Sequence, residues 1–154
     1  MGAIGGPARA LWVIGHRVTP IPVGGRVVAL EVATPPGVPG PPPHHHEDAD
    51  ECFHVIAGRL GVMVDGEWTA LGPGERVDIP RGAVHTFRND GREEARAITA
   101  FEPAGFEAFF EEYGVDVSRP GAFEESVSEA MIRRVAEGCH RFGMILAADR
   151  PARG

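Results

Sequence analysis

Glycine and proline interrupt this chain at short intervals, and no other feature of the sequence limits its fold as strongly. The 21 glycines and 14 prolines make up more than a fifth of the 154 residues. Between residues 26 and 102 they separate short apolar runs at a spacing of about 8–12 residues. This spacing is typical of an antiparallel sandwich or barrel, so we expect an all-β fold built from many short strands.

Eight apolar runs are the predicted strands of this fold. Asp65-Gly66, between two of these runs, is a hairpin turn signal. The segment 34–43 is rich in proline and glycine, and it predicts an irregular connection because it can form neither a helix nor a central strand. The predicted strands span residues 11–14, 26–33, 51–57, 59–64, 67–71, 76–79, 84–88 and 96–102.

Helical spacing appears only after Pro103. Three phenylalanines fall on one side of a predicted short helix over residues 106–113, and apolar residues recur at helical spacing over residues 123–137. No long linker and no internal repeat marks a second domain. We therefore expect a barrel over residues 1–103 and a C-terminal helical extension over residues 104–154 that packs on it.

The charge of the chain limits its partners and its chemistry. The formal net charge is −7 and no basic run is present, which argues against nucleic acid as a partner. All fifteen cationic side chains are arginines, so Schiff-base chemistry and any lysine nucleophile are excluded. No apolar run approaches the ~20 residues that span a bilayer, which argues against a membrane partner. A small-molecule substrate is the partner we expect.

The cellular compartment and the assembly state follow from smaller features. The N-terminus lacks the charged start and apolar core of a secretory signal. Cys52 and Cys139 are more simply interpreted as two reduced thiols than as a disulfide, so we expect a cytoplasmic protein. The run at residues 11–14 carries more apolar surface than a lone barrel edge should show, and we therefore expect a homodimer.

Histidines and one glutamate form the pattern that carries chemistry. His44 and His46 are two residues apart, so on a strand both imidazoles point to the same face. Glu51 follows a polar bend that resets this alternation, and His85 later shares a strand face with Phe87. Any one of these histidines alone is more simply a surface or core residue, but their joint spacing favours a site. Neutral imidazoles with one carboxylate suit Fe, Mn, Co, Ni or Zn rather than Ca or Mg.

Two motifs in this region resemble those of the cupins. Their first motif reads roughly G-x5-H-x-H-x3–4-E-x6-G; residues 37–58 match it with the leading glycine one position away, through Gly37, His44, His46, Glu51 and Gly58. Their second motif reads G-x5-P-x-G-x2-H-x3-N; residues 74–89 match it at every position, through Gly74, Pro80, Gly82, His85 and Asn89. The two motifs with the hairpin between them cover about a third of the chain.

The resemblance implies a fold, a metal site and a group of relatives. The fold is a single-domain double-stranded β-helix, the cupin or jelly-roll barrel. One divalent transition metal (Fe, Mn, Ni, Co or Zn) would lie in the barrel lumen, held by His44, His46, Glu51 and His85. The segment 103–107 looks like that of the quercetinase-like group, which includes flavonol dioxygenases. The polyketide-cyclase cupins look similar too.

Roles for single residues follow from this placement. Four protein ligands on a metal that prefers six leave positions for a substrate bound through oxygen. Glu51 is the candidate catalytic general base, with His54 or a metal-bound hydroxide as alternatives. The candidate apolar wall of a substrate pocket consists of Phe53, Val55, Met63 and Phe87. Plain barrel core is the simpler interpretation of each of these four taken alone.

Three hypotheses about function remain open at this point. The first is a metal-dependent enzyme, favoured as a dioxygenase, that acts on a small enol, phenolic or flavonol-like molecule. The second is a non-redox enzyme that uses the metal as a Lewis acid, such as a polyketide cyclase, an isomerase or a lyase. The third is a non-catalytic barrel that binds a small molecule, and the complete ligand set argues against it. Nothing in the sequence separates the first two.

Overall fold

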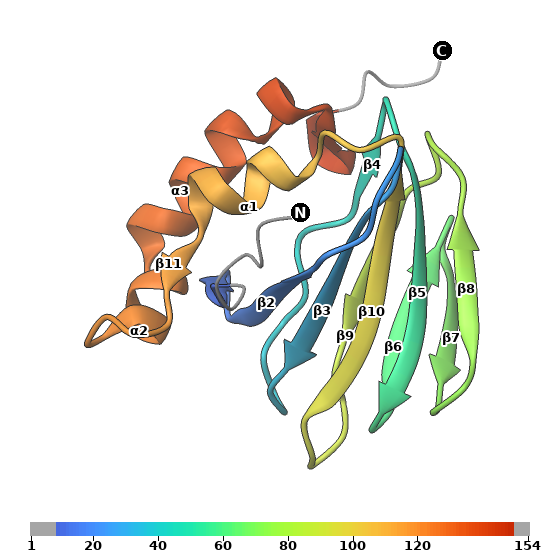
Figure 1. The fold of residues 1–154 in the computed structure, drawn as a ribbon, viewed down its shortest axis with the longest axis horizontal. Coiled ribbons are helices and arrows are strands. Elements are labelled where there is room, and N and C mark those ends of the chain that lie inside the picture. Colours follow the sequence, from blue (N-terminus) through green and yellow to red (C-terminus); the bar gives the residue numbers. More distant parts are fainter. Residues whose placement is uncertain (1–8, 150–154) are drawn as a thin grey trace, which may run out of the picture.

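The computed structural model describes residues 9–149, which form two antiparallel sheets that face each other (Figure 1). In order across the sheet, the larger one contains β11 (Val115–Asp116), β1 (Leu11–Val13), β2 (His16–Ile21), β3 (Val28–Thr34), β10 (Ala95–Glu102), β5 (Asp50–Ala57) and β8 (Arg76–Ile79). The smaller one contains β12 (Met144–Leu146), β4 (His44–His46), β9 (His85–Arg88), β6 (Leu60–Val64) and β7 (Glu67–Leu71). The predicted all-β barrel with a short C-terminal helical part is confirmed.

Alternation along the strands decides which side chains enter the barrel. In β5, Glu51, Phe53 and Val55 are buried, whereas His54 between them is exposed. The eight residues of β10 alternate in the same way until Glu102. Because a slip of one residue would turn each apolar side chain outward, this alternation holds the register of both strands.

The helices gather on the β2 side of the barrel, on the opposite side from β7 and β8 (Figure 1). They are α1 (Glu107–Tyr113), α2 (Ala122–Ser126) and α3 (Glu129–Gly138), and two 3-10 turns, η1 (Cys139–Phe142) and η2 (Ala147–Asp149), follow them. The predicted helix over residues 106–113 is confirmed as α1. The predicted helical segment 123–137 is two helices, because the hydroxyl of Ser128 accepts a hydrogen bond from the Met131 N–H and caps a new helix there.

Four strands lie outside the eight predicted ranges, and one of them, β4, was considered only as the strand that would carry His44 and His46. Strands β11 and β12 lie in the C-terminal segment, where only helices were expected. β11 is an edge strand of the larger sheet, and β12 is an edge strand of the smaller one. Strand β2 escaped notice because Arg17 and Pro20 interrupt its apolar pattern. Pro20 lies beyond Val18, the last β2 residue that pairs with β1, and a missing N–H donor is tolerated on such an open edge.

The described residues bear on three further expectations. Cys52 and Cys139 are free thiols. No helix among residues 9–149 has the length and apolar character needed to cross a bilayer. The apolar run at residues 11–14 packs against the chain's own core, and the Trp12 ring lies 5.1 Å from that of Phe123 in α2. The homodimer therefore stays a prediction, without the exposed edge that first suggested it.

Candidate metal centre

Three imidazoles meet inside the barrel on two neighbouring strands. His44 and His46 point inward from β4, and His44 pairs in register with His85 of β9. All three side chains are buried, at 5%, 4% and 1% exposure. One ring nitrogen from each lies within 4.8 Å of those of the other two, so the three could converge on a single metal ion.

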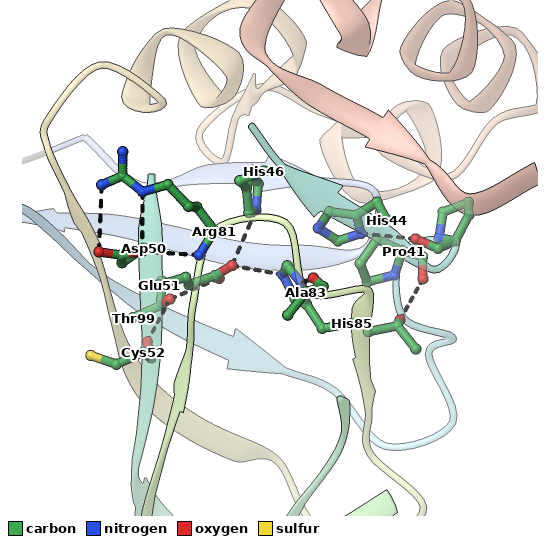
Figure 2. A network of polar contacts seen from close by, with 12 residues as sticks. Pro41, His44, His46, Asp50, Glu51, Cys52, Arg81, Ala83, His85 and Thr99 are labelled. Atoms are coloured by element: carbon green, nitrogen blue, oxygen red, sulfur yellow. Dashed lines mark hydrogen bonds and ion pairs between the residues drawn. The ribbon is translucent and has the colours of Figure 1, made fainter. Parts of the chain in front are cut away.

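Glu51 joins this cluster from the opposite sheet. Its Oε2 lies 2.8 Å from Nε2 of His85 and 3.1 Å from Nε2 of His46 (Figure 2). Its Oε1 accepts a hydrogen bond of 3.1 Å from the hydroxyl of Thr99 on β10. Glu51 thus contacts two of the three clustered histidines, and all four residues named as metal ligands line one cavity, while their role as ligands stays a prediction.

Backbone carbonyls fix the orientation of two of the rings. Nδ1 of His44 lies 2.9 Å from the carbonyl oxygen of Pro42, and Nδ1 of His85 lies 3.0 Å from that of Ala83. A carbonyl only accepts, so each Nδ1 carries a proton and leaves Nε2 to bind a metal. Nδ1 of His46 is buried and has no hydrogen-bond partner among residues 9–149. The donor set fits a transition metal held through Nε2 atoms and one carboxylate.

The electrostatics of the cluster also suit a metal. Burial acts to raise the pKa of Glu51, but hydrogen bonds from His46 and His85 outweigh it and hold the pKa well below its usual range. Burial, together with His85 and His46 nearby, lowers the pKa of His44 to about 3. Burial acts to lower the pKa of His85, yet the hydrogen bond to Glu51 raises it, so a metal would displace a proton there.

A small cavity of about 60 Å³ adjoins the four residues. Of the predicted pocket wall, Phe53 and Phe87 line this cavity, whereas Val55 and Met63 do not. Val55 is wholly buried in a second apolar cluster farther along β5. Met63 lies on the outer face of β6, where the Gly66 N–H lies 3.0 Å from its sulfur. The prediction for Met63 was wrong because the alternation of β6 turns its two neighbours inward instead.

His54 also lies away from the cavity. Phe53 and Val55, the residues on either side of His54 in β5, both point into the barrel. His54 therefore points outward, on the outer face of β5, and it is exposed. A side chain on that face cannot reach a molecule in the barrel. Of the two side chains considered as the general base, Glu51 is therefore the one that lines the cavity.

Several cavity residues were not foreseen. Thr99 and His16 line the cavity, as do three phenylalanines at the start of α1: Phe106, Phe109 and Phe110. Residues 97, 99 and 101 alternate with their neighbours along β10, and this pattern could have indicated that Thr99 points into the barrel. The position of the α1 phenylalanines depends on how the helix packs on the barrel, which local spacing does not contain.

Comparisons with known proteins agree with this geometry. A family model described as a cupin domain matches residues 30–101. The chain is 31% identical over 71 residues to quercetin 2,3-dioxygenase of Bacillus subtilis (strain 168). This alignment covers 46% of this chain and 21% of that protein. It is 40% identical over 60 residues to polyketide synthase CurC of Streptomyces cyaneus, and this alignment covers 39% of each of the two chains. The chain thus spans between about a fifth and two fifths of these relatives.

The fold comparison points the same way. The solved structure of an RmlC-like cupin from Shewanella frigidimarina NCIMB 400 superposes with a TM-score of 0.55 at 21% identity, over 62% of this chain and 85% of that one. Both sequence motifs lie within the segment 30–101 that matches the cupin-domain model, and the two facing antiparallel sheets have the fold of the cupins. The described residues form a single barrel of this fold.

Proposed function

We propose that this cupin is a metal-dependent enzyme that acts on a small oxygen-rich organic molecule, and that its reaction is a dioxygenation. The convergence of three imidazoles and one carboxylate on a buried cavity carries this proposal. The similarity to a quercetin dioxygenase supports the reaction type. The free thiols of Cys52 and Cys139 support a cytoplasmic setting.

The residues of the chain have separable roles in this proposal. His44, His46, His85 and Glu51 would hold one divalent transition metal, which supplies Lewis acidity and, if redox-active, one-electron chemistry with dioxygen. Three neutral imidazoles and one carboxylate leave such a site with a net charge of +1, which favours an anionic or enolisable oxygen. Glu51 would accept the enol or phenol proton, and the Thr99 hydroxyl would hold its carboxylate in place.

The volume of the cavity limits the size of the substrate that it could hold. A free volume of about 60 Å³ corresponds to roughly four water positions. A flavonol with three rings is far larger, and Phe106, Phe109 and Phe110 occupy part of the cavity wall. We therefore propose a compact enol rather than a flavonol as the substrate class.

A non-redox reaction is the second candidate. The match to polyketide synthase CurC has the higher identity of the two curated relatives above, 40% against 31%. A cyclisation or isomerisation would use the same metal and the same base but would not consume oxygen. Dependence on dioxygen therefore separates the two candidates.

The experiment loads the purified chain separately with Fe, Mn, Co, Ni and Zn and follows oxygen uptake with acetylacetone, a compact enol, and with quercetin. We expect uptake that rises with metal content and falls in Glu51→Gln. His54→Gln, which changes an exposed residue on the same strand, should retain the wild-type rate. Substrate loss that continues without oxygen would favour the non-redox reaction instead, and a chain that takes up no metal would contradict the proposal.

A further inference from the structure

One polar residue of the cavity is not accounted for by the metal centre. Six polar side chains line the cavity, namely His16, His44, His46, Glu51, His85 and Thr99. Four of them are the candidate ligands. The hydroxyl of Thr99 is shared between Glu51 Oε1, at 3.1 Å, and the carbonyl oxygen of Cys52, at 3.0 Å. Only His16 remains without a role in the site.

The surroundings of His16 leave one ring nitrogen unused. His16 is the first residue of β2 and is 3% exposed. Its Nδ1 lies 3.1 Å from the hydroxyl oxygen of Thr34, and its ring lies 5.0 Å from that of Phe87. Its Nε2 is buried and forms no hydrogen bond of normal geometry with any of residues 9–149, although the backbone carbonyl of Pro39 lies near enough to the ring to affect its pKa. An unsatisfied buried group of this kind costs about 1–3 kcal/mol, so its position calls for an explanation.

The ring is neutral near pH 7. Burial lowers the pKa of His16 to about 4, although the backbone carbonyl of Pro39 acts in the opposite direction. A neutral imidazole has one N–H donor and one lone-pair acceptor. The contact with Thr34 occupies Nδ1, so Nε2 can pair with an oxygen atom, either as donor to a carbonyl or as acceptor from a hydroxyl.

We propose that His16 is a positioning residue whose Nε2 forms a hydrogen bond with an oxygen atom of the small molecule bound in the cavity. This inference rests on the proposed function, since the same molecule would bind the metal through another of its oxygen atoms. The ligand class is then a compact molecule with at least two oxygen atoms. The apolar lining between the two polar ends, which includes Phe53 and Phe87, would contact its carbon skeleton.

Two substitutions separate this role from a purely structural one. The amide of Asn superposes on the Nδ1 side of a histidine ring, and that of Gln reaches the Nε2 position. His16→Asn therefore retains a partner for Thr34 and loses the group that faces the ligand. His16→Gln retains the group at the Nε2 position and gives up the contact with Thr34. A structural role predicts that Gln is the more harmful change, and a ligand-positioning role predicts that Asn is.

The experiment uses the zinc-loaded chain and acetohydroxamate, a compact ligand that chelates through two oxygens. Calorimetry should show a Kd about two- to tenfold weaker for His16→Asn and within about twofold of wild type for His16→Gln, the range expected for one hydrogen bond. Zinc stoichiometry should be equal in all three proteins. In wild type, the ¹⁵N signal of His16 Nε2 should shift on binding, which tests the contact even if a variant does not fold.

Four results would decide against the inference. A His16→Asn protein that binds acetohydroxamate as tightly as wild type, equal losses in both variants, or a His16 signal that does not respond would each overturn it while the metal site stands. Zinc-loaded wild type that binds no acetohydroxamate would overturn it as well. A wild-type chain that takes up none of the five metals, zinc included, would instead overturn the proposed function, and this inference with it.

Discussion

Oε2 of Glu51 lies 2.8 Å from Nε2 of His85, and this contact joins the two sheets of the barrel across its interior. Glu51 belongs to β5 of the larger sheet and His85 to β9 of the smaller one. Both side chains are buried, so bulk water has little access to this contact. A buried carboxylate and a buried imidazole at this distance depend on each other or on a metal between them.

The first prediction concerns metal content. Wild type should bind about one transition-metal ion per chain, and His85→Ala should lose most of it, because one of four ligands is removed. Elemental analysis after reconstitution and desalting measures this directly. His54→Ala is the matched control, since it removes an exposed histidine and should retain the full metal content. Equal metal in both variants would contradict the assignment of His85.

The second prediction separates the two roles of Glu51. Glu51→Gln retains an oxygen ligand and should retain much of the metal, yet it loses the proton acceptor. Turnover should then fall by roughly 10²–10⁴, the range for loss of a general base. Glu51→Ala should lose metal as well as turnover. A Gln variant with full metal and near-normal kcat would show that Glu51 only holds the ion.

The third prediction tests how tightly the proline-rich connection packs beside the site. A Cβ atom at Gly40 would overlap the backbone carbonyl oxygen of Phe87, so Gly40→Ala must displace β9. We expect a loss of about 3 kcal/mol or more in the free energy of unfolding. At Gly24 a Cβ would meet no atom within 4 Å, so Gly24→Ala should change stability by less than about 1 kcal/mol. Urea denaturation of both variants compares these values, and similar effects would show that Gly40 is not confined.

The fourth prediction concerns the pH dependence of stability in the metal-free chain. The pKa of His16 falls from 6.5 to about 4 on folding, so between these values the unfolded chain binds a proton that the folded chain does not. Stability should therefore fall as the pH falls, and His16 should contribute about 2 kcal/mol of that loss between pH 7 and pH 5. Urea denaturation of wild type and His16→Gln at both pH values isolates this share, because the contribution of His44 is common to both. Parallel pH profiles would show that His16 titrates normally.

The fifth prediction is a homodimer. Large apolar side chains remain exposed on the outer faces of both sheets, among them Ile56 of β5 at 40% and Trp68 of β7 at 42%. Pairing of two barrels would cover part of this surface. Sedimentation equilibrium should give twice the chain mass of 16.4 kDa, and a mass equal to one chain would contradict the prediction.

The sequence contained most of the strand positions and all four clustered side chains. Both depend on local spacing: the inward alternation of β5 and the two-residue step from His44 to His46 are visible in a single segment. Met63 was misplaced because β6 is buried on both faces, so apolar character alone does not tell inside from outside. Val55 does face inward, but it lies in the core cluster farther along β5 and not at the cavity, a difference that alternation alone does not contain.

Other features depend on contacts between distant segments. His16 could not be recognised as a cavity residue without β2, and β2 becomes a strand because β1 and β3 pair with it on either side. The break at Ser128 between two helices is visible only when the hydroxyl is seen to cap the Met131 N–H. Weak local patterns are overridden by tertiary pairing at these places.

The pairing of β4 has a consequence for the time at which the site matures. Strand β4 carries His44 and His46, and it pairs with β9 at one position but with β12 at three. Residues 144–146 leave the ribosome long after both histidine motifs, so the nascent barrel presents its metal-binding strand with one neighbour only. Metal capture in the final geometry must therefore wait until β12 has been synthesised and has paired with β4, although both histidine motifs lie far earlier in the chain.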